Sequence, residues 1–251
     1  NYRVISIFFG GGTPSLLTGE QIGRLMDTVR EIFTLDEDAE ITMEMNPGTV
    51  TEEKLRKYRQ AGVNRLSIGL QSVNDEELRL LGRIHTYEEF LEAYHLARAN
   101  GFANINVDLI SAIPGQTVES WRRTLEQVMA LFPEHISAYS LILEEGTTFY
   151  KKYVEDEAKE GPKLPDEDAE RQMYWDTETL METNGYHRYE ISNYAKEGYA
   201  CRHNLGYWER IPYLGFGIGA ASLVPGDLIG KCRKLKGKMS RYTNPDQLRE
   251  Y

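Results

Sequence analysis

Short apolar runs alternate with amphipathic stretches through about the first 145 residues of the chain. Each apolar run is bounded by turn residues, as expected of buried strands. Between the runs, apolar residues recur at helical spacing, as with Ile22, Leu25, Met26 and Val29. The predicted strands are the run from Val4, then Ala39–Met45, Arg65–Leu70, Asn104–Ile110 and His135–Leu143. Strands with helical segments between them predict a parallel sheet with right-handed crossovers.

The helical segments carry their own start and stop signals. Gly62 follows a predicted helix over 51–61, at the position where glycine commonly ends a helix. Two pairs have the spacing of a capping box, which marks a helix start: Thr18 with Gln21, and Thr86 with Glu89. Local sequence signals therefore mark where predicted helices begin and end.

Polar residues recur at or near the ends of the predicted strands: Thr13, Glu44, Gln71, Asp108 and Glu144. In a barrel, the carboxyl ends of parallel strands converge on one mouth, whereas in a flat doubly wound sheet they spread along an edge. Polar residues on every strand favour the barrel, and five strands are too few for an eight-fold closure. The predicted fold is α/β, an incomplete TIM-like (β/α) barrel with a small α+β C-terminal domain.

The composition changes over 150–165, where Lys and Glu are dense and a Gly-Pro step occurs. We expect a solvated helix end and a linker there. The predicted domains are 1–150, a partial barrel, and 151–251, a smaller C-terminal domain. Within the second domain, the pattern predicts a helix over 166–183 and a strand-like segment over 185–193.

The first strand breaks into the glycine loop, Gly10–Pro14. Adjacent glycines cost backbone entropy, and ligands sit at the carboxyl ends of parallel strands. The loop is therefore a candidate ligand-contacting loop, with a simple strand-to-helix turn as the alternative. It matches neither GxxxxGK[ST] nor GxGxxG, so a nucleotide-phosphate loop has weak support.

Glu44, Gln71 and Asp108, together with Arg83, supply carboxylates, an amide and a guanidinium. Carboxylates and amides bind ammonium groups and ribose hydroxyls, and arginine pairs with a carboxylate. An amino-acid-bearing nucleoside fits this set of groups. For a single carboxylate, a helix cap or a salt bridge is the alternative, and Asn46 could cap the turn that follows Glu44.

Composition narrows the classes of partner. The net charge of −10 argues against broad nucleic-acid binding, because phosphates must be neutralised. The basic stretch Lys231–Lys238 is the exception and is expected to be a solvated loop. No run reaches the length of a membrane span, so no stable membrane insertion is expected. The two cysteines, Cys201 and Cys232, make no disulfide framework, which suits a reducing cytoplasm.

Five stretches, in this order and spacing, resemble the radical S-adenosylmethionine (SAM) family: FFGGGTPSLL, EMNPG, RLSIGLQS, LGRIHT and NVDLISAIPGQT. The branch is that of oxygen-independent coproporphyrinogen III oxidase and its relatives, and the resemblance covers nearly the whole chain. It implies a partial barrel of six parallel strands. It also implies that the methionyl amino group of SAM is held by Gly11, Gly12 and Thr13, and that its other polar parts contact Glu44, Gln71, Arg83 and Asp108.

The family holds a [4Fe–4S] cluster through CxxxCxxC in a loop after its first strand, and this sequence has no such spacing. That loop would lie upstream of Asn1. Neither Cys201 nor Cys232 can replace three clustered thiolates, so the chain as given lacks the cysteines needed for reductive cleavage. We expect it to be part of a longer protein, with loss of the chemistry as the alternative.

A second motif, HNLGYW, begins at His203. A histidine and two aromatic residues packing a small core would be the simplest explanation. However, HNxxYW resembles the haem-binding motif of the haem chaperone (HemW) branch, and aromatic rings suit a flat macrocycle. The resemblance implies that His203 binds the haem iron, with Cys201 as the alternative ligand. The implied haem site is His203, Asn204, Tyr207 and Trp208.

The expected function is that of a cytoplasmic, haem chaperone-like radical SAM protein that binds haem and SAM and delivers haem to target proteins. Two alternatives stay open: an oxygen-independent coproporphyrinogen III oxidase, and a degenerate binding module without turnover. The residues of this sequence do not decide whether the chain acts as an enzyme, because they do not include the cluster cysteines.

Overall fold

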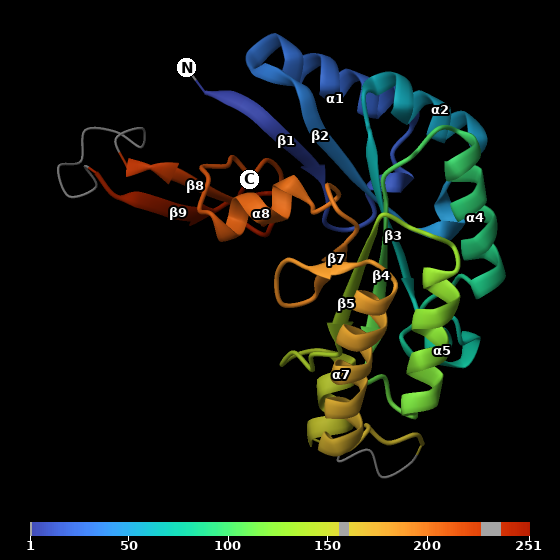
Figure 1. The fold of residues 1–251 in the computed structure, drawn as a ribbon. Helices are drawn as coiled ribbons and strands as arrows, with labels where there is room; N and C mark the ends of the chain where they lie inside the picture. Colours follow the sequence, from blue (N-terminus) through green and yellow to red (C-terminus); the bar gives the residue numbers. More distant parts are fainter. Residues whose placement is uncertain (1, 156–160, 227–236) are drawn as a thin grey trace. The chain divides into compact units, whose positions relative to one another are not determined.

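Figure 1 shows the computed structural model, which describes residues 2–155, 161–226 and 237–251. The chain divides into two compact units, residues 1–200 and 201–251. The first unit is a curled, open sheet with helices packed along it, which confirms the predicted α/β fold and incomplete barrel. The second unit contains a short helix and a two-stranded sheet.

Seven strands form the sheet of the first unit, and the first five run parallel in chain order. Two short strands then extend the sheet beyond the fifth in the antiparallel sense. Across the sheet the strands are β1 (Arg3–Phe9), β2 (Thr34–Met45), β3 (Arg65–Gln71), β4 (Ile105–Ser111), β5 (His135–Ser140), β7 (Asn193–Ala195) and β6 (His187–Arg188). The single strand-like segment expected over 185–193 is therefore a hairpin.

Two helices of the first unit begin at the capping boxes that the sequence predicts. Both capping boxes form, and Gly62 ends its helix with a φ of 108°. The helices are α1 (Gly19–Ile32), α2 (Glu52–Ala61), α3 (Asp75–Leu80), α4 (Tyr87–Ala99), α5 (Val118–Met129), α6 (Thr148–Tyr150) and α7 (Glu167–Thr183), with a π-turn at Lys151–Glu155 and 3-10 turns at Pro14–Leu16 and Pro47–Thr49. Within the described residues, no helix combines the length and apolar character required to cross a bilayer.

The two faces of the sheet differ in polarity because successive strand side chains point to opposite sides. One face packs against the helices through buried apolar residues such as Ile68 and Val107. The other face, called here the polar face, carries in neighbouring strands the residues Thr42, Glu44, Arg65, Ser67, Asn106, Asp108, His135 and Ser137. Strands of a parallel sheet are usually apolar on both sides, so this lining indicates a site.

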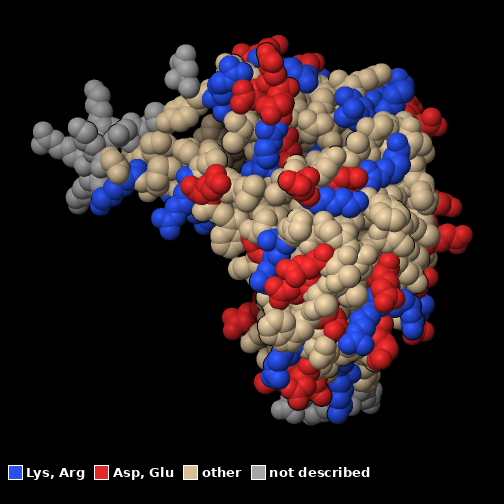
Figure 2. Space-filling model, in the orientation of Figure 1, with Lys and Arg blue, Asp and Glu red and all other residues tan. Residues whose placement is uncertain are grey.

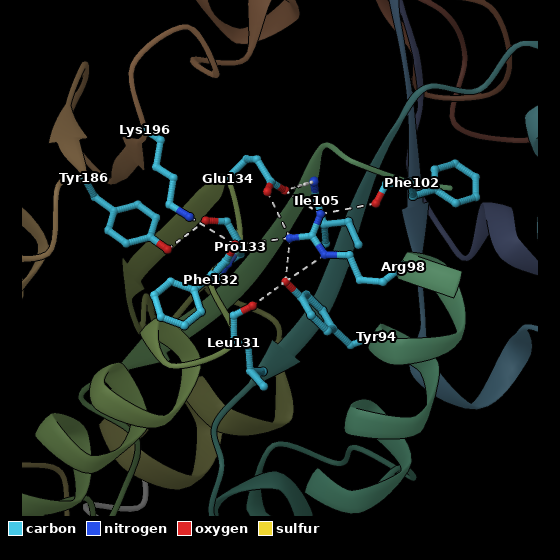
Figure 3. Close-up of polar contacts among 10 residues, drawn as sticks. All are labelled: Tyr94, Arg98, Phe102, Ile105, Leu131, Phe132, Pro133, Glu134, Tyr186 and Lys196. Atoms are coloured by element: carbon cyan, nitrogen blue, oxygen red, sulfur yellow. Dashed lines mark hydrogen bonds and ion pairs between the residues drawn. The ribbon is translucent and has the colours of Figure 1, made fainter. Parts of the chain in front are cut away.

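An ion pair ties the amino ends of β4 and β5 to α4 (Figure 3). Arg98 of α4 lies 2.8 Å from the carboxylate of Glu134, which also accepts from the backbone N–H of Ile105 at 3.0 Å. Arg98 also donates to the hydroxyl of Tyr94 at 2.7 Å, and that hydroxyl donates to the Leu131 carbonyl at 3.0 Å. One guanidinium thus connects three segments at the amino-terminal end of the strands, the end opposite the glycine loop.

The segment after residue 150 packs with the first unit, so the division at Ala200 differs from the predicted domain boundary. The indole N–H of Trp121 in α5 donates to Thr177 of α7 at 2.9 Å, and β7 pairs with β5. The composition change over 150–165 therefore marks a connection inside the first unit. Part of that expected linker, 156–160, lies outside the described residues.

The second unit contains α8 (Arg202–Trp208) and the antiparallel pair β8 (Ala221–Pro225) and β9 (Met239–Thr243). A Cβ at Gly215 would lie 2.1 Å from the carbonyl oxygen of Ala221, so only glycine fits there. The unit is α+β, as predicted, but smaller than expected. Most of the basic stretch Lys231–Lys238, and Cys232 within it, lie outside the described residues.

Candidate functional site

The glycine loop contacts Glu44 at the carboxyl end of the parallel strands. A Cβ at Gly10 would lie 2.8 Å from Cε1 of Phe8 and 3.2 Å from Oε1 of Glu44, so a side chain there would collide. Gly11 has a φ of 89°, which glycine adopts without strain, and its backbone N–H donates to the Glu44 carboxylate. The loop is therefore shaped around Glu44.

The rest of the loop is tied to the end of β2. A Cβ at Gly12 would have no neighbour within 4 Å, so that position is open. Thr13 precedes the 3-10 turn at Pro14–Leu16 without a side-chain cap bond. In that turn, Ser15 accepts from the backbone N–H of Asn46 at 3.1 Å. Asn46 makes no side-chain cap of its own turn, contrary to the capping alternative.

Glu44 and Asp108 lie near enough to repel one another. Burial raises the pKa of Glu44 to about 7, the charge of Asp108 adds to the rise, and the Gly11 amide opposes it. Burial also raises the pKa of Asp108 above its usual range. A cationic ligand placed beside these two neighbouring carboxyl groups would stabilise their ionised forms.

Hydrogen bonds across the polar face hold Asp108 in place. Ser67 donates to Oδ2 at 2.9 Å, and the Asn106 amide donates to Oδ1 at 2.8 Å. Asn106 also donates to Ser67 at 2.7 Å, and Ser137 contributes a further bond to Asp108. These three residues support Asp108 from β3, β4 and β5, and none of them was predicted from the sequence. The available signal was a polar residue at alternate positions of otherwise apolar strands.

His135 completes this network from the start of β5. Its Nδ1 lies 2.6 Å from the Asn106 side-chain oxygen, and its Nε2 lies 2.8 Å from the Tyr189 hydroxyl. Burial lowers the pKa of His135 well below its usual value, and the charge of Arg65 lowers it further. A neutral imidazole therefore donates to Asn106 and accepts from Tyr189, which makes His135 a structural support.

Gln71 ends β3 in a left-handed conformation, with a φ of 75°. The register of β3 and β4 shifts between Gly69 and Gln71, and Gly69 lies opposite Asp108. A Cβ at Gly69 would lie 2.9 Å from Nε2 of Gln71, so the Gln71 amide folds over this glycine. The amide is thereby brought to the strand position next to Asp108.

Arg83 reaches the same group from beyond α3. Burial lowers the pKa of Arg83, and the charge of Asp108 opposes that shift, so the two groups interact. Tyr139 approaches Asp108 from β5, where burial raises its pKa and Asp108 adds to the rise. Glu144 is not part of this group, because β5 ends at Ser140 and Glu144 is exposed beyond it.

The motif at His203 forms a short helix, α8. A hydrogen bond of 3.0 Å joins Nε2 of His203 to the Tyr207 hydroxyl, and the two rings meet edge to face at 4.9 Å. Tyr207 continues edge to face onto Tyr213 at 4.7 Å. Asn204 lies on the same helix, and Trp208 is 54% exposed at its end. Cys201 is buried at the position before the helix.

The sequence model of the radical SAM superfamily matches residues 1–128, just over half of the chain. The chain belongs to the radical SAM superfamily. The barrel strands β1 to β4, with the glycine loop, Glu44, Gln71, Arg83 and Asp108, all lie inside the matched residues.

Relatives of this radical SAM chain include two proteins named haem chaperone HemW. HemW of Escherichia coli (strain K12) is 45% identical over 218 residues, which is 87% of this chain and 56% of the relative. HemW of Bacillus subtilis (strain 168) is 40% identical over 222 residues, 88% of this chain and 58% of the relative. The chain therefore spans a little over half the length of these relatives.

A solved structure of coproporphyrinogen III oxidase (HemN) from Escherichia coli, described as a radical SAM enzyme, is similar in fold. The TM-score is 0.77 with 27% sequence identity, over 99% of this chain and 56% of that chain. The match covers the curled sheet, and it agrees with the partial barrel that the strand pattern predicts.

The radical SAM family implies SAM and a [4Fe–4S] cluster, and the two fit the described residues differently. SAM carries cationic sulfonium and amino groups and a carboxylate, which suit the Glu44–Asp108 pair and Arg83. The cluster needs thiolates, and the described part of the chain contains no group of three His, Cys, Asp or Glu that could hold a metal ion.

The surface charge bears on the expected partners. On the face drawn in Figure 2, acidic and basic side chains are interspersed in small groups. Over the whole sequence, 39 acidic residues outnumber 29 basic ones. This net negative charge disfavours long-range electrostatic attraction to the phosphate backbone of nucleic acids.

Proposed function

We propose that this chain is part of a haem chaperone of the radical SAM superfamily, which binds haem and delivers it to target proteins. The observation that carries the proposal is the HNLGYW motif on α8, where His203 and Tyr207 form one bonded pair. The identity of 45% to a protein named haem chaperone supports it over 87% of this chain. The shortage of cysteines in the sequence supports a place in the cytoplasm.

In the proposed haem site, His203 binds the iron through an imidazole nitrogen. Nε2 would exchange its bond to Tyr207 for the metal, and the Tyr207 hydroxyl would then turn to the porphyrin edge or to water. The exposed ring of Trp208 is available to cover the macrocycle, and Asn204 to orient the helix end. Cys201, buried before the helix, is the competing ligand.

In the proposed SAM site, Gly11, Gly12 and Thr13 bind the methionyl amino group. When bound with the cluster, SAM supplies one-electron cleavage chemistry. The chain's own residues position and discriminate the molecule: open backbone at Gly12 admits it, and the carboxyls face its cationic groups. Its remaining polar parts would contact Glu44, Gln71, Arg83 and Asp108.

The second candidate is the oxygen-independent oxidation of coproporphyrinogen III. The observation that favours it is the similarity in fold to HemN across 99% of this chain. A binding module without turnover is the third candidate. The oxidase and the binding module would use the same SAM site as the haem chaperone. The HNLGYW motif and the reaction products are therefore what distinguish the three candidates.

The test uses the full-length protein with its cluster reconstituted. Haem is titrated into it, the complex is mixed with an apo haem protein, and transfer is followed by absorbance. In parallel, coproporphyrinogen III is supplied with SAM and a reductant, and decarboxylated products are measured. The chaperone proposal expects haem binding and transfer without decarboxylation. Decarboxylation without haem binding would replace it with the oxidase.

A further inference from the structure

A buried carboxylate outside the proposed SAM site joins the segments that follow two of its strands. Glu77, in the middle of α3, is only 4% exposed. Ser72 and Gln116 donate to its Oε2 at 2.6 Å and 2.8 Å, and Ser120 donates to its Oε1 at 2.5 Å. Donors from three different segments therefore satisfy both oxygens. These four residues are called the Glu77 cluster below.

The segment that Glu77 anchors carries a proposed SAM contact at each end. Ser72 follows Gln71 directly, and its hydroxyl also accepts from the backbone N–H of Asn74 at 3.0 Å. At the far end, the backbone N–H of Arg83 donates to the carbonyl of Leu78, the neighbour of Glu77, at 2.9 Å. A displacement of α3 would therefore move both Gln71 and Arg83.

The other side of the cluster belongs to the strand that carries Asp108. Gln116 lies in the connection after β4, and Ser120 lies in the first turn of α5. That connection begins with Ala112, which has a φ of 59°. Two residues other than glycine, Gln71 and Ala112, thus adopt a left-handed conformation at the ends of neighbouring strands. Such strain persists only where the surrounding contacts fix it, and the Glu77 cluster joins the segments after both residues.

We propose that Glu77 is a positioning residue for SAM. It holds the segment from Gln71 to Arg83 against the start of α5, and so sets both side chains relative to Asp108. The inference rests on the proposed SAM site. The carboxylate of Glu77 is taken up by Ser72, Gln116 and Ser120, so its proposed role is to hold this segment and not to bind SAM directly.

The first test compares variants of Glu77 in the full-length protein with its cluster, by calorimetry of SAM binding. Glu77→Ala leaves three donors without their acceptor, and SAM affinity should fall about tenfold, as for other residues that orient a ligand's contacts. Glu77→Gln can still accept from Ser72 and Gln116 through its amide oxygen and donate to Ser120, so its affinity should stay within about threefold of the parent. Glu76→Ala, on an exposed neighbour in the same helix, is the matched control.

The second test is a double-mutant cycle between Glu77 and Arg83, because coupling distinguishes positioning from a general loss of stability. Glu77→Ala should change SAM affinity less in the Arg83→Ala background than in the parent. A purely structural role would lower the thermal midpoint equally in both backgrounds and leave affinity unchanged while the protein is folded. Ser120→Ala, which removes one donor and leaves the carboxylate, keeps the test available if Glu77→Ala does not fold.

Parental SAM affinity in folded Glu77→Ala, or in Ser120→Ala if only that variant folds, would overturn the proposal. A loss in Glu77→Gln as large as that in Glu77→Ala, or fully additive effects in the cycle, would also overturn it. Loss of affinity in Arg83→Ala alone would refute the positioning role and leave the proposed SAM site standing. Parental affinity in Arg83→Ala would instead refute the site itself at that residue.

Discussion

Gly10 lies against the carboxylate of Glu44, and a methyl group at Gly10 would stand 3.2 Å from Oε1. The same methyl group would lie 2.8 Å from the Phe8 ring, closer than such contacts allow. Both neighbours are half-buried side chains on the paired strands β1 and β2, and each has to shift if Gly10 gains a side chain. The absence of a side chain at Gly10 thus leaves room for Glu44.

Gly10→Ala should therefore displace Glu44 and weaken SAM binding by about tenfold, because groups that contact a ligand must keep their geometry closely. Calorimetry on the full-length protein measures the loss. Gly23→Ala is the control, since a Cβ there meets nothing within 4 Å and lies within α1. Unchanged SAM affinity in Gly10→Ala would contradict the role of this glycine in placing Glu44 for binding.

The pKa of Glu44 predicts how stability depends on pH. Burial and Asp108 raise this pKa from 4.5 to about 7 in the folded chain. Glu44 therefore contributes stability in full below pH 4.5, and the contribution is lost as pH rises through about 7. Glu44→Gln should flatten that part of the pH profile and make the protein more stable than the parent at about pH 8.

Urea denaturation midpoints of parent and variant across this range provide the measurement. Glu31→Gln, on an exposed position of α1, should keep the parental profile. If Glu44→Gln retained the same decline with rising pH as the parent, the pKa assignment to Glu44 would be wrong.

The ion pair in Figure 3 should matter for stability and not for ligand binding. Glu134→Ala removes the carboxylate that neutralises the Arg98 guanidinium and leaves the Ile105 amide without its acceptor, and should cost about 2 kcal/mol in the free energy of unfolding. SAM affinity should stay at the parental value. Glu126→Ala, on an exposed position of α5, is the control, and a cost below about 0.5 kcal/mol for Glu134→Ala would contradict the prediction.

Tyr207→Phe tests how the proposed haem ligand is held. The variant keeps the ring beside His203 and removes the hydroxyl that bonds Nε2. Because iron no longer has to displace that bond, haem affinity should rise by up to about fivefold, with the spectrum of the parent complex. Absorbance titration measures both quantities. Loss of the bound spectrum in Tyr207→Phe would mean that the hydroxyl, and not His203 alone, holds the iron.

Local signals predicted most elements of the first unit because caps and apolar periods act within a few residues. The capping box at Thr18 fixes the start of α1, as read from the sequence. The start of β2 at Thr34, earlier than Ala39, was missed. Before Ala39 the strand carries three successive acidic residues, 36–38, at exposed or half-buried positions, so no apolar alternation marks it. The register with β1 also shifts between Val4 and Ser6.

The site shows the same division between local and long-range information. Glu44, Gln71 and Asp108 could be grouped in advance because parallel strands bring their carboxyl ends together. The residues that hydrogen-bond Asp108 depend on the register between neighbouring strands. That register is set by long helical connections and is not visible in a local sequence pattern. Glu144 was wrongly grouped with them because the apolar run after His135 continues beyond Ser140, where β5 ends.

The most direct test of the haem chaperone proposal is an absorbance titration of haem into the full-length protein and into its His203→Ala variant, with Cys201→Ser in parallel. The proposal predicts one haem per parent chain with an imidazole-type Soret spectrum, and weaker binding with an altered spectrum in His203→Ala only. Parental affinity and spectrum in His203→Ala, with their loss in Cys201→Ser, would contradict the assignment of His203. Absence of haem binding by the parent would contradict the proposed function itself.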